Sequence, residues 1–240
     1  MEHRLQQLVD SYTIPAEAVE LVRTTPIVLL VGVSGAGKDT IKHHLLKTGQ
    51  YHHIISHTTR QPRENGGVME RDGVDYHFIS KEQAVAMLED GEFIEAKEYS
   101  GNVYGTSVAE IQKAHHEGKI AITDVEIQGV AEYKAISSTV IAQFILPPTY
   151  QEWQRRLSTR YGQEGADPAD MAKRMTTAIA ELKEALAQPY YHFVVNEDID
   201  EAVGAVDSIA HHKDEFTQID RSYRVWAERL LEDLQSGASL

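Results

Sequence analysis

The sequence contains no cysteine among its 240 residues. Disulfide bonds and thiolate chemistry are therefore excluded, and a reducing, cytoplasmic location is expected. Long apolar runs are also lacking, since the run at residues 27–33 is far shorter than the roughly 20 residues that a membrane-spanning helix needs. The charged first residues, MEHRLQQLVDSY, lack the apolar segment of a secretory signal peptide. We therefore expect neither export nor a membrane partner.

Positive charge is scarce as well. The chain has 23 Lys and Arg against 37 Asp and Glu, which gives a formal net charge of −14 and disfavours a nucleic acid partner. A small anionic substrate remains compatible with this balance, because cationic residues gather locally. Two such groups occur along the chain: Arg60, Arg63 and Arg71, and later Arg155, Arg156, Arg160, Lys173 and Arg174.

Apolar strands that alternate with helical patterns indicate an α/β fold with a parallel sheet. The polar stretch 54–78 favours short strands and loops, and helical signals occur within residues 1–25 and 214–240. A capping box at Ser80 predicts a helix that stops at Gly91. Further strands are predicted at 27–33, 120–123, 140–146 and 193–195, and further helices at 38–47, 108–117, 150–160, 168–187 and up to about residue 212.

A glycine-rich segment between a predicted buried strand and a predicted helix fits the pattern G-x-x-x-x-G-K. Its glycines allow backbone N–H groups to surround phosphate oxygens, and the helix N-terminus adds positive potential. Lys38 would reach the β- and γ-phosphates. The pattern predicts an ATP-binding loop made of Gly32, Val33, Ser34, Gly35, Ala36, Gly37, Lys38, Asp39 and Thr40.

The residue after the lysine departs from this pattern. A serine or threonine hydroxyl normally binds Mg²⁺ there, but this chain has Asp39, followed by Thr40. Either Thr40 supplies the hydroxyl, or the Asp39 carboxylate is itself the oxygen ligand. Asp124 follows a predicted strand, where a carboxylate can organise the water shell of the metal. We therefore expect Mg²⁺ as a cofactor beside ATP.

Several short segments follow the loop in a fixed order: Ser56–Arg63, Asp72–Phe78, Phe93–Glu95, Gly101–Thr106, Asp124–Gly129, Phe144–Pro148, Arg156–Arg160, Arg174–Met175 and Val195–Asp198. With these segments the sequence resembles the guanylate kinase family over roughly residues 26–212. The resemblance implies transfer of a phosphoryl group from ATP to GMP or dGMP.

The resemblance also implies the domain plan. A P-loop NTPase core, with three α/β/α layers around a parallel sheet, would span residues 26–213. A small mixed-β subdomain at about 54–107 would bind GMP, and a helical lid at about 156–174, with its glycine-rich stretch 162–167, would close over the phosphates. For the helical extensions 1–25 and 214–240, the expected roles are docking onto the core or contact within a homo-oligomer.

The resemblance assigns GMP binding to residues whose chemistry suits it. Guanidinium forks from Arg60 and Arg63 would bind the phosphate, and a carboxylate, Glu95, would accept the two donors of the guanine edge. The full set is Ser56, as donor to guanine O6, Arg60, Arg63, Glu70, Tyr76, Glu95, Tyr104, Thr106 and Glu126. Counting back from Tyr76 identifies Glu70, although counting forward from Arg63 identifies Gly66, because the intervening stretch is about four residues longer than the family's.

The catalytic residues implied by the family are cations that neutralise charge on the transferred group: Lys38, Arg156, Arg160 and Arg174. Arg155 has no family counterpart, so we expect it on a solvated helix surface. Glu126 also departs from the family, which usually has aspartate there.

Two other functions compete with this interpretation. A related kinase for ribose 1,5-bisphosphate can carry Gly-Lys-Asp in its loop, but it needs no guanine readers such as Ser56 and Glu95. A non-catalytic module that binds proteins tends to lose the phosphate loop and the lid arginines, which this chain retains.

Overall fold

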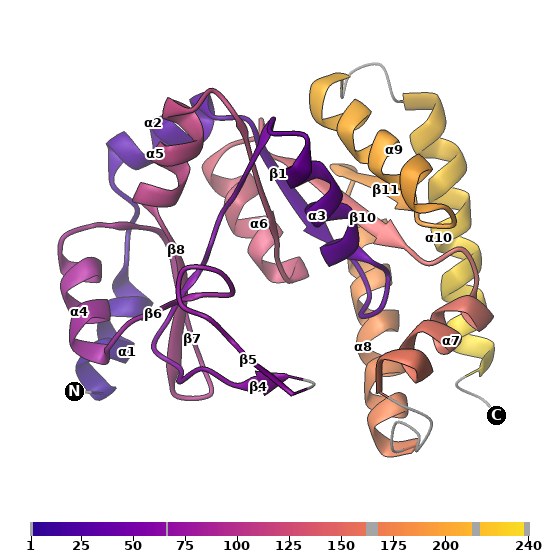
Figure 1. Ribbon diagram of the computed structural model, residues 1–240, viewed down its shortest axis with the longest axis horizontal. Helices are drawn as coiled ribbons and strands as arrows, with labels where there is room; N and C mark the ends of the chain where they lie inside the picture. The colour runs from indigo at the N-terminus through magenta and orange to yellow at the C-terminus, as the bar shows by residue number, and fades with distance from the viewer. Residues whose placement is uncertain (1, 66, 162–167, 213–216, 238–240) are drawn as a thin grey trace. The chain divides into compact units, whose positions relative to one another are not determined.

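The computed structural model describes residues 2–65, 67–161, 168–212 and 217–237. The chain divides into two compact units, both drawn in Figure 1. The first unit contains Met1–Pro26 and Tyr51–Ala121, and the second contains Ile27–Gln50 and Ile122–Leu240. Among the described residues, no helix combines the length and apolar character needed to cross a membrane.

The second unit is built on a parallel sheet in the order β11-β10-β1-β9. Strand β1 (Ile27–Val31) pairs in parallel with β10 (Ile141–Leu146), which pairs in parallel with β11 (Tyr191–Val195). Strand β9 (Ile120–Asp124) enters this unit from the first. Every residue of β1 and β10 is buried, which explains why both strands are continuous apolar runs rather than alternating ones.

Helices pack around this sheet. α3 lies against α9, and α10 runs along α8 and β11 (Figure 1). Ala227, Leu230 and Leu234 of α10 are buried, so the C-terminal segment belongs to the core of this unit. The helices are α3 (Lys38–Lys47), α6 (Ile127–Ile136), α7 (Tyr150–Tyr161), α8 (Pro168–Ala187), α9 (Ile199–His212) and α10 (Thr217–Gly237).

The first unit contains a mixed sheet in the order β6-β3-β8-β7, as expected for the smaller subdomain. β3 (His57–Thr58) is parallel to β6 (His77–Phe78) and antiparallel to β8 (Asn102–Ser107), which also pairs with β7 (Phe93–Tyr99). β4 (Glu64–Asn65) and β5 (Val68–Met69) form a separate antiparallel pair. The unit also contains α1 (Glu2–Ser11), α2 (Ala16–Thr24), β2 (Tyr51–His53), α4 (Lys81–Glu89) and α5 (Val108–His116).

The N-terminal helices pack within this first unit. α1 lies against α4 and β7, where Leu5, Leu88 and Phe93 share one apolar cluster. The Tyr12 hydroxyl donates to the Phe93 carbonyl (2.6 Å) and accepts from the Phe93 amide (3.0 Å). These contacts anchor the N-terminal segment to β7.

Candidate active site

The predicted phosphate loop connects β1 to α3, and three of its glycines have positive φ: Gly32 at 137°, Gly35 at 82° and Gly37 at 96°. A Cβ atom on Gly32 would collide with the carbonyl oxygen of Ile145, and one on Gly37 would collide with the Asn196 amide. Glycine is therefore required at Gly32 and Gly37 for two reasons: the backbone has positive φ there, and no space is left for a Cβ atom.

Donors from neighbouring elements hold the loop carbonyls. Asn196 Nδ2 donates to the Ala36 carbonyl (2.7 Å), and Trp153 Nε1 donates to the Ser34 carbonyl (2.8 Å). The Lys38 ammonium donates to the Gly32 carbonyl within the loop itself. These hydrogen bonds hold the loop in the conformation described. No local sequence signal assigned these roles to Asn196 and Trp153, because both residues are distant from the loop along the chain.

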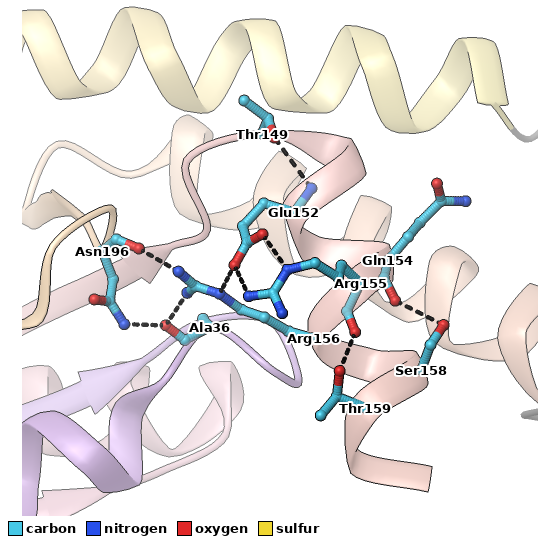
Figure 2. Close-up of polar contacts among 9 residues, drawn as sticks. All are labelled: Ala36, Thr149, Glu152, Gln154, Arg155, Arg156, Ser158, Thr159 and Asn196. Atoms are coloured by element: carbon cyan, nitrogen blue, oxygen red, sulfur yellow. Dashed lines mark hydrogen bonds and ion pairs between the residues drawn. The ribbon is translucent and has the colours of Figure 1, made fainter. Parts of the chain in front are cut away.

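One of the predicted lid arginines lies directly on this loop. Figure 2 shows Arg156 extending from α7 toward Ala36 and Asn196. Its Nη2 donates to the Asn196 carbonyl (2.9 Å), its Nη1 to the Ala36 carbonyl (3.5 Å) and its Nε to Glu152 (2.8 Å). Hydrogen bonds from Arg155 and Arg156 lower the pKa of Glu152 to about 2. Glu152 therefore stays anionic near neutral pH and orients Arg156.

Of the other two predicted lid arginines, the structure describes the side chain of Arg174 but not that of Arg160. Arg174 of α8 pairs with Asp170 (3.0 Å) and lines a cavity of about 270 Å³ together with Ser34 of the loop and Glu181. The side chain of Arg160 and the glycine-rich lid stretch 162–167 lie outside the described residues. Arg155 has an exposed side chain that pairs with Glu152, as expected for a solvated helix residue.

The carboxylates predicted to serve Mg²⁺ share one buried cation. Lys42 Nζ donates to Asp124 Oδ1 and lies 3.5 Å from Asp39 Oδ1, although its side chain is only 8% exposed. Burial alone would raise the pKa of Asp124, but the Lys42 ammonium outweighs that effect and leaves the pKa below its ordinary value. Asp124 is therefore ionised at neutral pH.

This donor set fits Mg²⁺ bound together with a nucleotide. Carboxylate and hydroxyl oxygens of Asp39, Thr40 and Asp124 are the hard ligands that Mg²⁺ prefers. Within the described parts of the chain, no group of three or more His, Asp or Glu side chains could hold a metal by itself. Phosphate oxygens and water would therefore have to complete the coordination, which is how Mg²⁺ is usually bound in kinases.

The first unit assembles the residues predicted to bind the acceptor phosphate. Arg60 makes two hydrogen bonds to Glu70, at 2.8 and 3.1 Å, and its Nε donates to the Tyr104 hydroxyl at 3.2 Å. The guanidinium lies 5.3 Å from the centre of the Tyr76 ring. Glu70 also accepts from the Arg63 amide (2.8 Å). The counting that identified Glu70 thus leads to a residue in contact with both arginines.

The predicted guanine readers lie in the same mixed sheet. Glu95 of β7 is paired in register with Thr106 of β8, and the Thr106 amide donates to Glu95 Oε1 (3.0 Å). A register shift between Phe93 and Glu95 marks a bulge, a feature that commonly redirects a side chain. Ser56 immediately precedes β3. Glu126 belongs to the second unit, where it lines a cavity of about 310 Å³ with Glu181.

A partly buried histidine follows Ser56 and makes this unit sensitive to pH. Burial, and then the neighbouring His77, lower the pKa of His57 from 6.5 to about 4. Between these values the unfolded chain binds a proton that the folded chain does not. The free energy of unfolding should therefore fall by roughly 2 kcal/mol as the pH is lowered from 6.5 to 4.

Urea denaturation across this pH range tests the effect. His57→Gln should flatten the slope, whereas the exposed His116→Gln should not. Burial raises the pKa of Glu110, but hydrogen bonds from Lys113 and the Ile55 amide outweigh it, so Glu110 contributes only below about pH 4.5. An unchanged slope in His57→Gln between pH 6.5 and 4.5 would contradict the prediction.

The site consists of a glycine loop between a buried parallel strand and a helix, with a lysine at its end and arginines from two further helices beside it. These features define a P-loop nucleotide-binding protein. The guanylate kinase family model matches residues 23–213. The chain is 38% identical over 178 residues to the guanylate kinase of Syntrophotalea carbinolica, covering 73% of this chain and 80% of that one. It is 32% identical over 209 residues to the guanylate kinase of Clostridioides difficile, covering 87% and 97%.

Other similarities agree. The chain is 36% identical over 176 residues to guanylate kinase 1 of Oryza sativa, of whose length that match spans 44%. The crystal structure of guanylate kinase from Anaplasma phagocytophilum superposes with a TM-score of 0.57 at 25% identity, covering 80% of this chain and 88% of that one. The chain belongs to the guanylate kinase family, nucleoside monophosphate kinases whose known reaction transfers a phosphoryl group from ATP to GMP.

Proposed function

We propose that this chain phosphorylates GMP with Mg²⁺–ATP through the residues described above. The observation that carries the proposal is the Arg60 cluster. The Arg60 side chain is 10% exposed, and its guanidinium is held by Glu70 and Tyr104 beside the Tyr76 ring. A guanidinium fixed in this way is prepared to bind a dianionic phosphate at little conformational cost.

On the donor side, the phosphate loop and Lys38 bind the β- and γ-phosphates of ATP. Arg156, Arg160 and Arg174 neutralise the charge that develops on the transferred phosphoryl group. Asp39 or Thr40, with Asp124, would hold Mg²⁺, which supplies charge neutralisation between the phosphates when bound. No strong general base is required, because the attacking atom is already a phosphate oxygen.

On the acceptor side, Arg60, Arg63, Tyr76 and Tyr104 bind the phosphate of GMP, and Glu70 orients Arg60. Glu95 accepts the N1–H and N2–H donors of guanine, while Ser56 donates to O6. Thr106 donates its amide to Glu95 and thereby orients the carboxylate. Adenine lacks this donor pair, so a site built around Glu95 would leave the carboxylate unsatisfied by AMP.

Replacing Glu95 with Gln tests this base recognition. The amide keeps the shape of the side chain but loses one acceptor, so kcat/KM for GMP should fall by the equivalent of about 1–3 kcal/mol. The KM for ATP should not change. The matched control is the exposed Glu92→Gln, three residues earlier in the chain, which should retain full activity. A normal rate with GMP in Glu95→Gln would remove Glu95 from the site.

A further inference from the structure

We infer that Lys42 is a positioning residue that offsets the charge of Asp39 and holds Asp124, so that the loop end of α3 carries less negative charge before Mg²⁺–ATP binds. The inference rests on the proposed function, because it concerns the same nucleotide site. It assigns a role to a lysine outside the G-x-x-x-x-G-K pattern.

The geometry places one ammonium between two carboxylates. Lys42 lies one turn after Asp39 on α3, and the two side chains form an i,i+3 pair at 3.5 Å. Asp124 comes from the end of β9, and its Oδ1 accepts a hydrogen bond from the same nitrogen. The side chains of Asp39 and Asp124 are 63% and 39% exposed, so the carboxylates face solvent while the lysine stem is buried.

The local charges explain why a lysine belongs here. A phosphate loop with Ser or Thr after its lysine carries no charge at that position, whereas Asp39 adds one negative charge where triphosphate must bind. Without a partner, this charge would repel the phosphates. Lys42 restores neutrality within one helical turn. We therefore interpret Asp39 and Lys42 as two linked departures from the usual loop sequence, in which the charge of Lys42 offsets that of Asp39.

Two consequences follow for binding. A free divalent cation has to compete with the Lys42 ammonium for Asp39 and Asp124, so the nucleotide-free protein should bind it weakly. Metal-free ATP meets a site that carries one negative charge fewer than it would without Lys42, so its binding should depend on Lys42 even though Lys42 does not contact the phosphates. Both consequences are measurable without turnover.

The experiment uses Lys42→Met, which keeps the buried stem and removes the charge. Binding of free Mn²⁺ to the nucleotide-free full-length protein, followed by electron paramagnetic resonance, should become tighter by on the order of tenfold. Binding of ATP in excess EDTA, followed by calorimetry, should become weaker by a similar factor. Lys47→Met, at the exposed end of the same helix, should change neither affinity.

The double variant Asp39→Ser/Lys42→Met distinguishes this role from the alternatives. Removing both charges should return both affinities to within about twofold of wild type, a threshold well below the expected change. Unchanged Mn²⁺ binding in Lys42→Met overturns the inference, and so does weak ATP binding that persists in the double variant, which would mean that Lys42 binds phosphate directly.

Protein folding and the proposed function are checked separately. Thermal denaturation establishes that each variant is folded. If Lys42→Met does not fold, Asp39→Ser alone is measured, which removes one negative charge and keeps the Lys42 ammonium paired with Asp124. Binding of metal-free ATP should then become tighter and binding of Mn²⁺ weaker, and the absence of either shift overturns the inference. GMP turnover by the wild-type enzyme is measured independently, so failure of the kinase assignment is not mistaken for failure of the charge pair.

Discussion

Replacing Lys38 with Met is expected to lower kcat/KM by about 10³-fold, or roughly 4 kcal/mol of transition-state stabilisation. In the structure, the Lys38 ammonium donates to the Gly32 carbonyl and approaches the Val33 carbonyl at 3.4 Å. These are neutral partners at the mouth of the loop, and the β- and γ-phosphates of ATP would replace them. The loss should be mainly in kcat, because charge on the transferred group increases in the transition state.

The exposed Lys47→Met, on the same helix, controls for loss of one positive charge from the protein. Steady-state kinetics with Mg²⁺–ATP and GMP measures both variants, and thermal denaturation verifies that the loop variant is folded. Activity of Lys38→Met within tenfold of wild type would mean that the loop does not carry the reaction.

The second large effect concerns Arg60. Arg60→Met should lower kcat/KM for GMP by about 10²-fold, because the guanidinium that binds the acceptor phosphate is lost. The variant should also be destabilised by about 1–3 kcal/mol, since Glu70, 11% exposed, loses two hydrogen bonds and its counter-charge. The Arg60 hydrogen bond lowers the pKa of Glu70, so this carboxylate would be left ionised without its main partner.

Glu70→Gln in the Arg60→Met background separates the two effects. The double variant should regain much of the stability lost in denaturant unfolding, because no unpaired charge remains, but it should not regain GMP affinity. Arg71→Met, an exposed arginine nearby in the chain, is the matched control and should behave as wild type. Recovery of GMP turnover in the double variant would show that Arg60 acts only through stability.

Much of the second unit could be predicted from local sequence signals. Helices α3 and α8 begin and end at the predicted residues, 38–47 and 168–187. In the first unit, the Ser80 capping box is likewise confirmed, with Ser80 Oγ accepting from the Gln83 amide and Gln83 Oε1 accepting from the Ser80 amide. Strong caps and continuous apolar strands specify structure without help from distant parts of the chain.

Two elements, the β7–β8 hairpin and helix α6, were not predicted from the sequence, and the reasons differ. The β7–β8 hairpin turns at Ser100 and Gly101, both with positive φ (52° and 78°), so its signal is a single Ser-Gly pair within a polar stretch. Helix α6 starts at Ile127, its N-cap residue Glu126 makes no capping hydrogen bond with its side chain, and it contains Gly129, a poor helix former. Packing within the fold, rather than local preference, specifies this helix.

The site residues likewise divide into those that a local sequence pattern predicts and those that it does not. The phosphate loop is contiguous, so its pattern could be recognised from the sequence. The partners that hold it could not be, because Lys42 and Asp124 are 82 residues apart, and Asn196 lies 160 residues from Ala36. Such contacts depend on which strands become neighbours in the sheet. No local periodicity encodes them.

The central claim is that this chain phosphorylates GMP, and a coupled assay of ADP release tests it most directly. Mg²⁺–ATP would be supplied with GMP, AMP, CMP, UMP or ribose 1,5-bisphosphate as the acceptor, using the full-length protein. We expect strong turnover with GMP alone, which would show that Asp39 and Glu126 are compatible with the family's reaction. Turnover with ribose 1,5-bisphosphate or another nucleotide in place of GMP, or binding of ATP without any turnover, would contradict the account.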